Sequence, residues 1–175
     1  METKRGCVHL YFGDGKGKTT AAMGLSLRAA GSGKKVLLCQ FLKGNHSSER
    51  NALQQIENIT CLKGSEQTKF TYQMTEEEKE ENKRQQLKML TEMIDQAGNY
   101  DMLVFDEVLY AIDLGQIPEE VLLTFLKNRP DQVEVVLTGR NPSKEMIALA
   151  DYASEIRKIK HPFDQGKEAR VGIEI

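Results

Sequence analysis

Few folds accommodate the order of the first forty residues. An apolar run at 8–12 leads into a glycine-rich loop at 13–20, and the apolar residues of 19–30 recur at helical spacing. A second apolar run at 36–41 has the length and composition of a buried strand. Strand, loop, helix and strand in this order form a βαβ unit, which predicts a mostly parallel sheet.

The rest of the chain continues the alternation of strands and helices. A capping box of Thr75 and Glu78 predicts a helix whose apolar stripe is Leu87, Leu90, Ile94 and Ala97, with the charged residues 76–84 as its solvated first turns. We expect loops and at most a short helix over 43–72. Further strands are expected at 102–105, 133–137, 156–159 and 171–175, with helices from Pro118 to about 126 and from Ser143 to 150.

Size and composition favour one globular domain spanning 1–175, because 175 residues are enough for one core and few for two. The net charge of −2 argues against binding to nucleic acid. The 3 cysteines are widely spaced, and Cys39 and Cys7 are expected in strands as small hydrophobes, which suits a reducing compartment. No apolar run approaches the roughly 20 residues that span a bilayer, so we expect a cytoplasmic protein with no membrane segment.

The glycine-rich loop carries the clearest chemical signal. Such a loop between a strand and a helix turns backbone N–H groups toward phosphate oxygens, and the helix start adds a partial positive charge. In this pattern Lys18 neutralises phosphate charge and the hydroxyl of Thr19 binds Mg²⁺; the competing interpretation is a flexible glycine turn. The predicted phosphate-binding residues are Gly13, Asp14, Gly15, Lys16, Gly17, Lys18, Thr19 and Thr20.

The loop departs from the usual pattern by one residue. A glycine normally stands five positions before the glycine of Gly-Lys-Thr, and Phe12 occupies that position in this chain, with Gly13 after it. The cradle is therefore altered, and Lys18 need not hold the β- and γ-phosphates as it does in enzymes that transfer the γ-phosphoryl group.

Two further strand ends fall on the same edge of a parallel sheet as the loop. Asp106 and Glu107 end the third apolar strand, where carboxylates meet Mg²⁺ directly or through water, although carboxylates at strand ends are common. Arg140 follows the fourth strand and is a candidate to clamp phosphate oxygens, the alternative being a surface arginine in a turn. The three histidines have no metal-ligand spacing.

Taken in order, the motifs resemble the corrinoid adenosyltransferases of the P-loop type, which act on cob(I)yrinic acid a,c-diamide and cob(I)alamin. The resemblance covers nearly the whole chain. Its segments are 13–22, 40–44, 105–107, 128–130, 138–140, 160–163 and 172–174. It implies an α/β P-loop nucleotide-binding (RecA-like) fold, a mostly parallel sheet with helices on both faces.

The resemblance also implies a reaction. Co(I) of a reduced corrinoid attacks the 5′ carbon of ATP, a cobalt–carbon bond forms, and triphosphate leaves. ATP lies reversed relative to ordinary P-loop ATPases, so that the loop, Lys18 and Mg²⁺ (or Mn²⁺) hold the triphosphate as leaving group, and Thr19 and Glu107, supported by Asp106, bind the metal. Position rather than a protein base drives the reaction, because the nucleophile belongs to the substrate.

Phe70 and Tyr72 occupy the positions of two aromatic residues that, in this family, cover the lower corrinoid face and remove an axial ligand from cobalt. Tyr72 departs from the tryptophan of some members. Without the resemblance, both residues would be interpreted as aromatic side chains that fill the hydrophobic core. The implied partners are ATP, the corrinoid, a reduced flavoprotein as electron donor, and a second copy in a homodimer.

Two rival functions follow from the motifs alone. A kinase or ATPase would attack the γ-phosphate and release ADP, whereas the adenosyltransferase releases triphosphate. A non-catalytic, ATP-dependent regulatory module would bind ATP without consuming a corrinoid.

Overall fold

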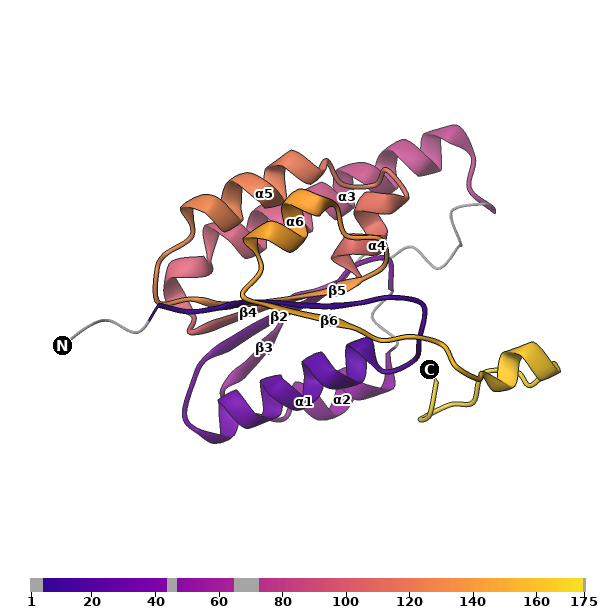
Figure 1. Ribbon diagram of the computed structural model, residues 1–175. Helices are drawn as coiled ribbons and strands as arrows, with labels where there is room; N and C mark the ends of the chain where they lie inside the picture. Colours follow the sequence, from indigo (N-terminus) through magenta and orange to yellow (C-terminus); the bar gives the residue numbers. More distant parts are fainter. Residues whose placement is uncertain (1–4, 44–46, 65–72, 175) are drawn as a thin grey trace.

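The computed structural model describes residues 5–43, 47–64 and 73–174. A central sheet of 6 strands has the order β3-β2-β4-β5-β1-β6, and each neighbouring pair is parallel (Figure 1). This confirms the α/β class and the mostly parallel sheet. The strands are β1 (Val8–Phe12), β2 (Val36–Gln40), β3 (Ile59–Cys61), β4 (Met102–Asp106), β5 (Glu134–Gly139) and β6 (Tyr152–Glu155).

Helices cover both faces of the sheet, as predicted. Helices α1 and α2 lie on one face, and α3, α4, α5 and α6 lie on the other (Figure 1). Their bounds are α1 (Lys18–Gly31), α2 (Ser48–Leu53), α3 (Glu76–Asp95), α4 (Val108–Asp113), α5 (Glu119–Asn128) and α6 (Lys144–Leu149). Short 3₁₀ turns occur at Ala97–Asn99 and Pro162–Gln165. No helix in the described ranges is long and apolar enough to cross a bilayer.

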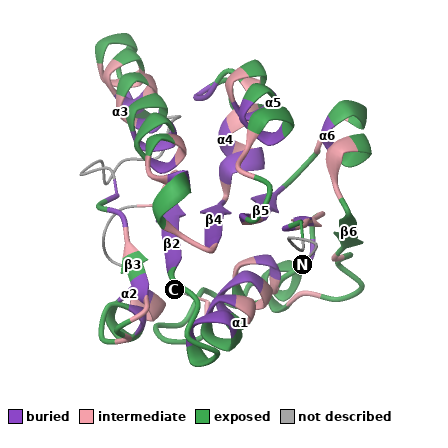
Figure 2. Ribbon diagram, turned by 90° about the vertical axis from the view of Figure 1, so that its left-hand side faces the viewer, coloured by how far each residue is buried: buried purple, intermediate pink, exposed green. Residues whose placement is uncertain are grey.

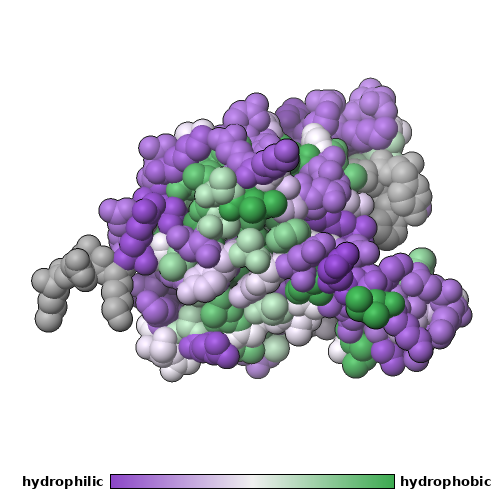
Figure 3. Space-filling view, in the orientation of Figure 1, coloured by the Kyte–Doolittle hydropathy of each residue, from purple (hydrophilic) through white to green (hydrophobic). Residues whose placement is uncertain are grey.

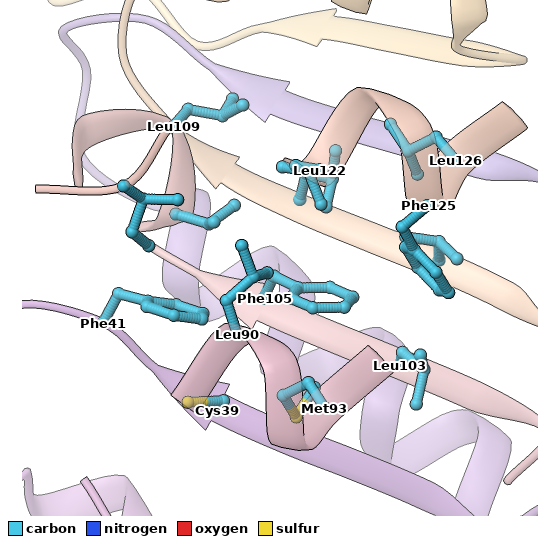
Figure 4. Close-up of a cluster of buried hydrophobic side chains, with 14 of the residues drawn as sticks. Cys39, Phe41, Leu90, Met93, Leu103, Phe105, Leu109, Leu122, Phe125 and Leu126 are labelled. Atoms are coloured by element: carbon cyan, nitrogen blue, oxygen red, sulfur yellow. The ribbon is translucent and has the colours of Figure 1, made fainter. Parts of the chain in front are cut away.

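The central strands are apolar along their length because both of their faces are covered. Every residue of β2 and β4 is buried, whereas every residue of the edge strand β6 is exposed (Figure 2). On the α3 side of the sheet, Phe41 stacks against Phe105, and Leu90 and Met93 of α3 pack into the same cluster (Figure 4). This core fixes where β2 and β4 end, and those ends carry the site.

Helix α3 begins as predicted, and its buried face includes only part of the predicted apolar stripe. The capping box of Thr75 and Glu78 is present, and the first turns carry exposed ion pairs such as Lys79 with Glu76. Of the predicted apolar stripe, Leu90 and Ala97 are buried and Ile94 packs against the core, whereas Leu87 is 36% exposed. The residues that α3 buries are Asn82, Gln86, Met89, Leu90 and Met93.

The predicted strands at 156–159 and 171–175 are wrong. The strand that pairs with β1 is β6, four residues earlier, and the chain leaves the sheet after Ile156 because β1 itself ends at Phe12. Local turn bonds to the carbonyl of Arg170 shape 171–174. The sequence also missed β3 and α4, and Cys7 precedes β1 instead of lying in it.

Candidate functional site

The glycine-rich loop connects β1 to α1, and its first two glycines lie against the chain that leaves β6. The N–H of Gly15 donates to the carbonyl oxygen of Ile156 at 2.8 Å. A Cβ atom on Gly13 would lie 2.5 Å from that oxygen, and one on Gly15 would lie 2.7 Å from it. Gly13 also has φ +112°, which other residues rarely adopt. Backbone contact therefore sets the shape of the shortened loop.

Gly13→Ala should lower both the unfolding temperature and the affinity for ATP, because the loop must move away from Ile156. We expect a loss of about 1–3 kcal/mol for the strained backbone. The matched control is Gly24→Ala in α1, where a Cβ meets no atom within 4 Å. That control should be neutral or slightly stabilising, since alanine favours a helix. Thermal unfolding and ATP titration measure both, and equal behaviour of the two variants would contradict the argument.

The loop ends where α1 begins, with Gly17 in a left-handed conformation as the N-terminal cap. Lys18 is only 8% exposed, and its ammonium donates to the carbonyl oxygen of Gly15 at 2.8 Å. Burial lowers the pKa of Lys18. The side chain of Asp14 turns away from the loop interior and accepts a hydrogen bond from the N–H of Lys158 at 2.9 Å, which lowers the pKa of Asp14.

Asp106, at the end of β4, is the centre of the site and is fully buried. Its Oδ1 accepts hydrogen bonds from the hydroxyls of Thr19 at 2.9 Å and Thr138 at 2.7 Å. Its Oδ2 accepts from the amide of Gln40 and the ammonium of Lys43, each at 3.2 Å. One carboxylate thus ties together the loop and the ends of three neighbouring strands.

Glu107 follows in a left-handed conformation, with φ 62°, as the N-terminal cap of α4. Its N–H donates to the hydroxyl of Thr138 at 2.8 Å, which directs the chain away from the sheet. Within the described residues, the carboxylate of Glu107 makes no hydrogen bond. Burial raises the pKa of Glu107, and the charge of Asp106 raises it further.

Sequence reasoning missed two side chains at and just after the end of β2, those of Gln40 and Lys43. Lys43 Nζ lies 3.4 Å from the Thr19 hydroxyl as well as beside Asp106, so its ammonium bridges two of the predicted metal ligands. Burial opposes its charge, but the carboxylates of Asp106 and Glu107 outweigh burial and raise the pKa of Lys43. Gln40 donates to Glu49 at 2.9 Å. The available signal was position: a polar residue ending a buried strand beside the loop.

A cavity of about 640 Å³ lies beside the loop, and Lys18, Lys43 and Glu107 line it. Its walls come from the loop, the start of α1, α2, the strand ends and the carboxyl-terminal segment. The lining residues are Gly15, Lys16, Gly17, Lys18, Thr19, Thr20, Met23, Lys43, Ser48, Glu49, Glu107, Gly172, Ile173 and Glu174. A cavity with ammonium groups, loop N–H groups and carboxylates in its wall suits a polyphosphate with a divalent cation.

A smaller cavity of about 280 Å³ lies on the other side of Lys16 and Lys18. Arg140 lines it, and the guanidinium stacks over the ring of Tyr110 at 5.4 Å from its centre. The opposite wall is the segment that projects from the sheet edge, where apolar side chains such as Phe163 are exposed (Figure 3). Arg140 is exposed and lies beside the loop, on the edge of the sheet where the sequence predicted it.

The residues at the end of β4 fit a magnesium ion. The hydroxyl of Thr19 and the carboxylates of Asp106 and Glu107 are the oxygen donors that Mg²⁺ prefers. Gln40 Oε1 is buried without a hydrogen-bond partner among the described residues, so it is free to accept from a metal-bound water. The described ranges contain no group of three or more His, Cys, Asp and Glu suited to a metal.

The structure thus brings together the loop residues, Thr19, Asp106, Glu107 and Arg140. Phe70 and Tyr72 lie outside the described residues. Thr138 and Lys43 join the predicted set, each from a segment that the sequence had marked without assigning its side chain a role.

Comparison with known proteins agrees with this geometry. The family model ATP:corrinoid adenosyltransferase BtuR/CobO/CobP matches residues 4–175. A corrinoid adenosyltransferase of Escherichia coli K12 is 35% identical over 176 residues, covering 99% of this chain and 87% of the relative. Corrinoid adenosyltransferase CobA of Salmonella typhimurium is 34% identical over 181 residues, with the same two coverages of 99% and 87%.

A solved structure, the KaiC-like protein PH0186 of Pyrococcus horikoshii, is similar with a TM-score of 0.49 and 16% identity, over 97% of this chain and 76% of that one. The family assignment rests on the sequence matches, which run through every segment of the site. The chain belongs to the ATP:corrinoid adenosyltransferase family, and it is a corrinoid adenosyltransferase of cobalamin biosynthesis or salvage.

Proposed function

We propose that the shortened loop holds the triphosphate of ATP as a leaving group while the ribose faces the corrinoid. The lone pair of Co(I) attacks the 5′ carbon, the bond between that carbon and its oxygen breaks, and the electron pair leaves on triphosphate. The observation that carries the proposal is the loop itself, whose Gly13 and Gly15 are held against Ile156 in a cradle one residue shorter than usual. Substrates are the reduced corrinoid and ATP.

Catalysis in this proposal comes from position and charge. The N–H of Gly15 donates to Ile156, so in this proposal the other N–H groups of residues 14–19 and the ammonium of Lys18 face the departing oxygens, where negative charge grows during the reaction. Lys16, whose side chain is half exposed, and Arg140 approach the same phosphates from the smaller cavity. These interactions strengthen as charge develops, so they lower the barrier more than they stabilise bound ATP.

Mg²⁺ or Mn²⁺ would be held by Thr19 and Glu107, with Asp106 in support. Bound there, the cation would neutralise charge on the triphosphate. Asp106 accepts the hydrogen bond that aims the Thr19 hydroxyl, and Gln40 and Thr138 hold Asp106 in turn. The proposed roles therefore divide into Thr19 and Glu107 as direct ligands and Asp106 as the group that orients Thr19.

A single-turnover assay distinguishes this reaction from attack at the γ-phosphate. The assay is run under anoxic conditions with ATP and chemically reduced corrinoid, and the absorption spectrum of the cobalt follows formation of the cobalt–carbon bond. We expect one triphosphate to be released for each bond formed. Release of ADP would instead identify a kinase or ATPase, and ATP binding without corrinoid consumption would identify a regulatory module. Either result would overturn the proposal.

Phe70 and Tyr72 would cover the lower face of the corrinoid and exclude an axial ligand, which makes Co(II) easier to reduce. Phe70→Ala should then reduce catalysis from Co(II) more than catalysis from Co(I) reduced beforehand. The two assays are run on the same preparation with the same corrinoid, so that any general loss cancels. Equal losses in both would remove the role of ligand exclusion.

The remaining partners follow from this chemistry. Co(I) requires a strong one-electron donor, for which we propose a reduced flavoprotein. We also propose a homodimer and a cytoplasmic location, where thiols such as the buried Cys39 stay reduced. Sedimentation of the purified protein tests the dimer, and reduction of corrinoid-bound enzyme by flavodoxin-type donors tests the electron source.

A further inference from the structure

Three buried amide side chains form a network behind the site, on the α3 side of the sheet. Asn82 and Gln86 come from α3, and Gln116 comes from the turn between α4 and α5; they are 3%, 0% and 6% exposed. Asn82 Nδ2 donates to Gln116 Oε1 at 2.8 Å, and Gln86 Nε2 donates to Asn82 Oδ1 at 3.4 Å. Gln116 Nε2 donates to the carbonyl oxygen of Leu114 at 3.4 Å.

The network ends on the backbone of Leu42. Gln86 Oε1 accepts a hydrogen bond from the N–H of Leu42 at 3.2 Å. Leu42 has φ 60°, a left-handed conformation that is unfavourable for a branched residue and persists only where neighbouring groups hold it. The residue before it is also held, because the N–H of Phe41 donates to the carbonyl oxygen of Asp106 at 2.8 Å.

This turn determines where Lys43 goes. Lys43 follows Leu42 directly, and its ammonium reaches Asp106 and the Thr19 hydroxyl in the wall of the larger cavity. The left-handed Leu42 lies between the end of β2 and Lys43, and the ammonium of Lys43 lies 3.2 Å from Asp106 at the end of the neighbouring strand β4. Without an acceptor for the Leu42 N–H, the turn would lose the bond that holds it.

An apolar side chain would be the ordinary choice at a fully buried position of a helix packed on a sheet. Gln86 instead brings a polar amide into the core, where every unmade hydrogen bond is costly. The side-chain nitrogen of Gln86 donates to Asn82, which fixes the orientation of the amide. The side-chain oxygen of Gln86 accepts from the N–H of Leu42 and so holds the backbone of that residue.

We propose that Gln86 is a positioning residue for the adenosyltransferase reaction: the Asn82–Gln86–Gln116 network holds the left-handed turn at Leu42 and thereby places the Lys43 ammonium at the triphosphate side of the cavity. The inference rests on the proposed function insofar as that cavity holds the triphosphate. Gln86 itself is fully buried and touches no substrate, so it acts through Lys43.

The test is a double-mutant cycle on ATP binding with Mg²⁺ and without corrinoid. Gln86→Met keeps the length and volume of the side chain but removes both polar atoms. We expect Lys43→Met to weaken ATP affinity by about 10- to 100-fold, as for loss of a charged hydrogen bond, and Gln86→Met by about 5- to 10-fold. The double variant should match Lys43→Met alone. Losses that multiply, or normal ATP binding by either single variant, would overturn the proposal.

Met93→Ala is the matched control for stability. Met93 lies on the same helix, fully buried, and the large-to-small change destabilises the core while leaving the hydrogen bond between Gln86 and Leu42 in place. Measured well below both unfolding temperatures, this variant should bind ATP normally. An equal loss of affinity would show that Gln86→Met acts through stability alone and would refute the proposal.

If Gln86→Met fails to fold, Asn82→Ala takes its place. Asn82→Ala should give a smaller loss of ATP affinity, and that loss should disappear when Lys43→Met is present. Its persistence in the double variant would refute the proposal.

Because binding is measured without corrinoid, the result is independent of how the reaction proceeds. Release of ADP in the single-turnover assay would refute the proposed reaction and leave the cycle interpretable. A cycle without coupling would refute the role of Gln86 and leave the proposed reaction intact.

Discussion

Lys18→Ala should abolish formation of the cobalt–carbon bond while the protein remains folded. The ammonium of Lys18 is the main side-chain cation of the loop. Removing one group that stabilises a developing negative charge lowers the reaction rate by about 100- to 1,000-fold. Further loss follows because the same ammonium holds the carbonyl of Gly15 at 2.8 Å and so closes the cradle. Triphosphate release in single turnover measures the effect.

The fold should tolerate this change. Burial lowers the pKa of Lys18, which means that the folded protein disfavours its charge, and that relief offsets the lost hydrogen bond to Gly15. The unfolding temperature should therefore change little. Lys34→Ala, at an exposed lysine beyond the other end of α1, is the control and should keep full activity. Turnover at the wild-type rate in Lys18→Ala would remove Lys18 from the site.

Glu107→Gln should separate activity from stability more sharply. Loss of the proposed metal ligand should reduce product formation by about 100-fold or more, since even partners of metal ligands are worth 10- to 100-fold. The unfolding temperature should hold or rise, because the Glu107 carboxylate makes no hydrogen bond to the described residues, and burial and Asp106 raise its pKa. Its charge thus destabilises the folded state in the absence of metal.

The stability difference between Glu107→Gln and the wild-type protein should depend on pH. The pKa of Glu107 is higher in the folded protein than in the unfolded chain, so the carboxyl group destabilises the fold only where it is ionised. The stability advantage of Glu107→Gln is expected to be full at pH values above the folded pKa of Glu107. It should shrink as the pH falls through the folded pKa, where wild-type Glu107 takes up a proton. Thermal unfolding at several pH values without metal measures it.

Asp106→Asn is the contrasting variant one residue away. Asp106 accepts four hydrogen bonds inside the protein, two on each oxygen and one of them from an ammonium. Asparagine keeps one acceptor oxygen, but its amide nitrogen cannot accept the two bonds made to the oxygen that it replaces, and the negative charge beside Lys43 is lost. Breaking a buried charged pair in this way costs about 3–5 kcal/mol, which is roughly 10 °C in a domain of this size. If Glu107→Gln were destabilised as much as Asp106→Asn, the division of the two carboxylates into a metal ligand and an orienting group would be wrong.

The local patterns of the sequence predicted most elements closely. The bounds of β1 agree with the apolar run at 8–12, and the caps at Thr75 and Ser143 are present. These features depend on neighbours within a few residues, so the sequence contains them directly. The errors fall where partners are distant: β6 is placed by its pairing with β1, and the buried face of α3 is set by amides that bond to Leu42 and Gln116.

The sequence alone determined the glycine-rich loop between β1 and α1, the acidic pair at the end of β4 and the family, because each depends on residue types at fixed short spacing. Only the tertiary structure decided that Asp106 would gather Thr19, Thr138, Gln40 and Lys43, and that Glu107 would stand beside them without a partner among the described residues. Those contacts join positions up to 87 residues apart. They exist because parallel strands bring their carboxyl ends to one edge of the sheet, whatever lies between them in the chain.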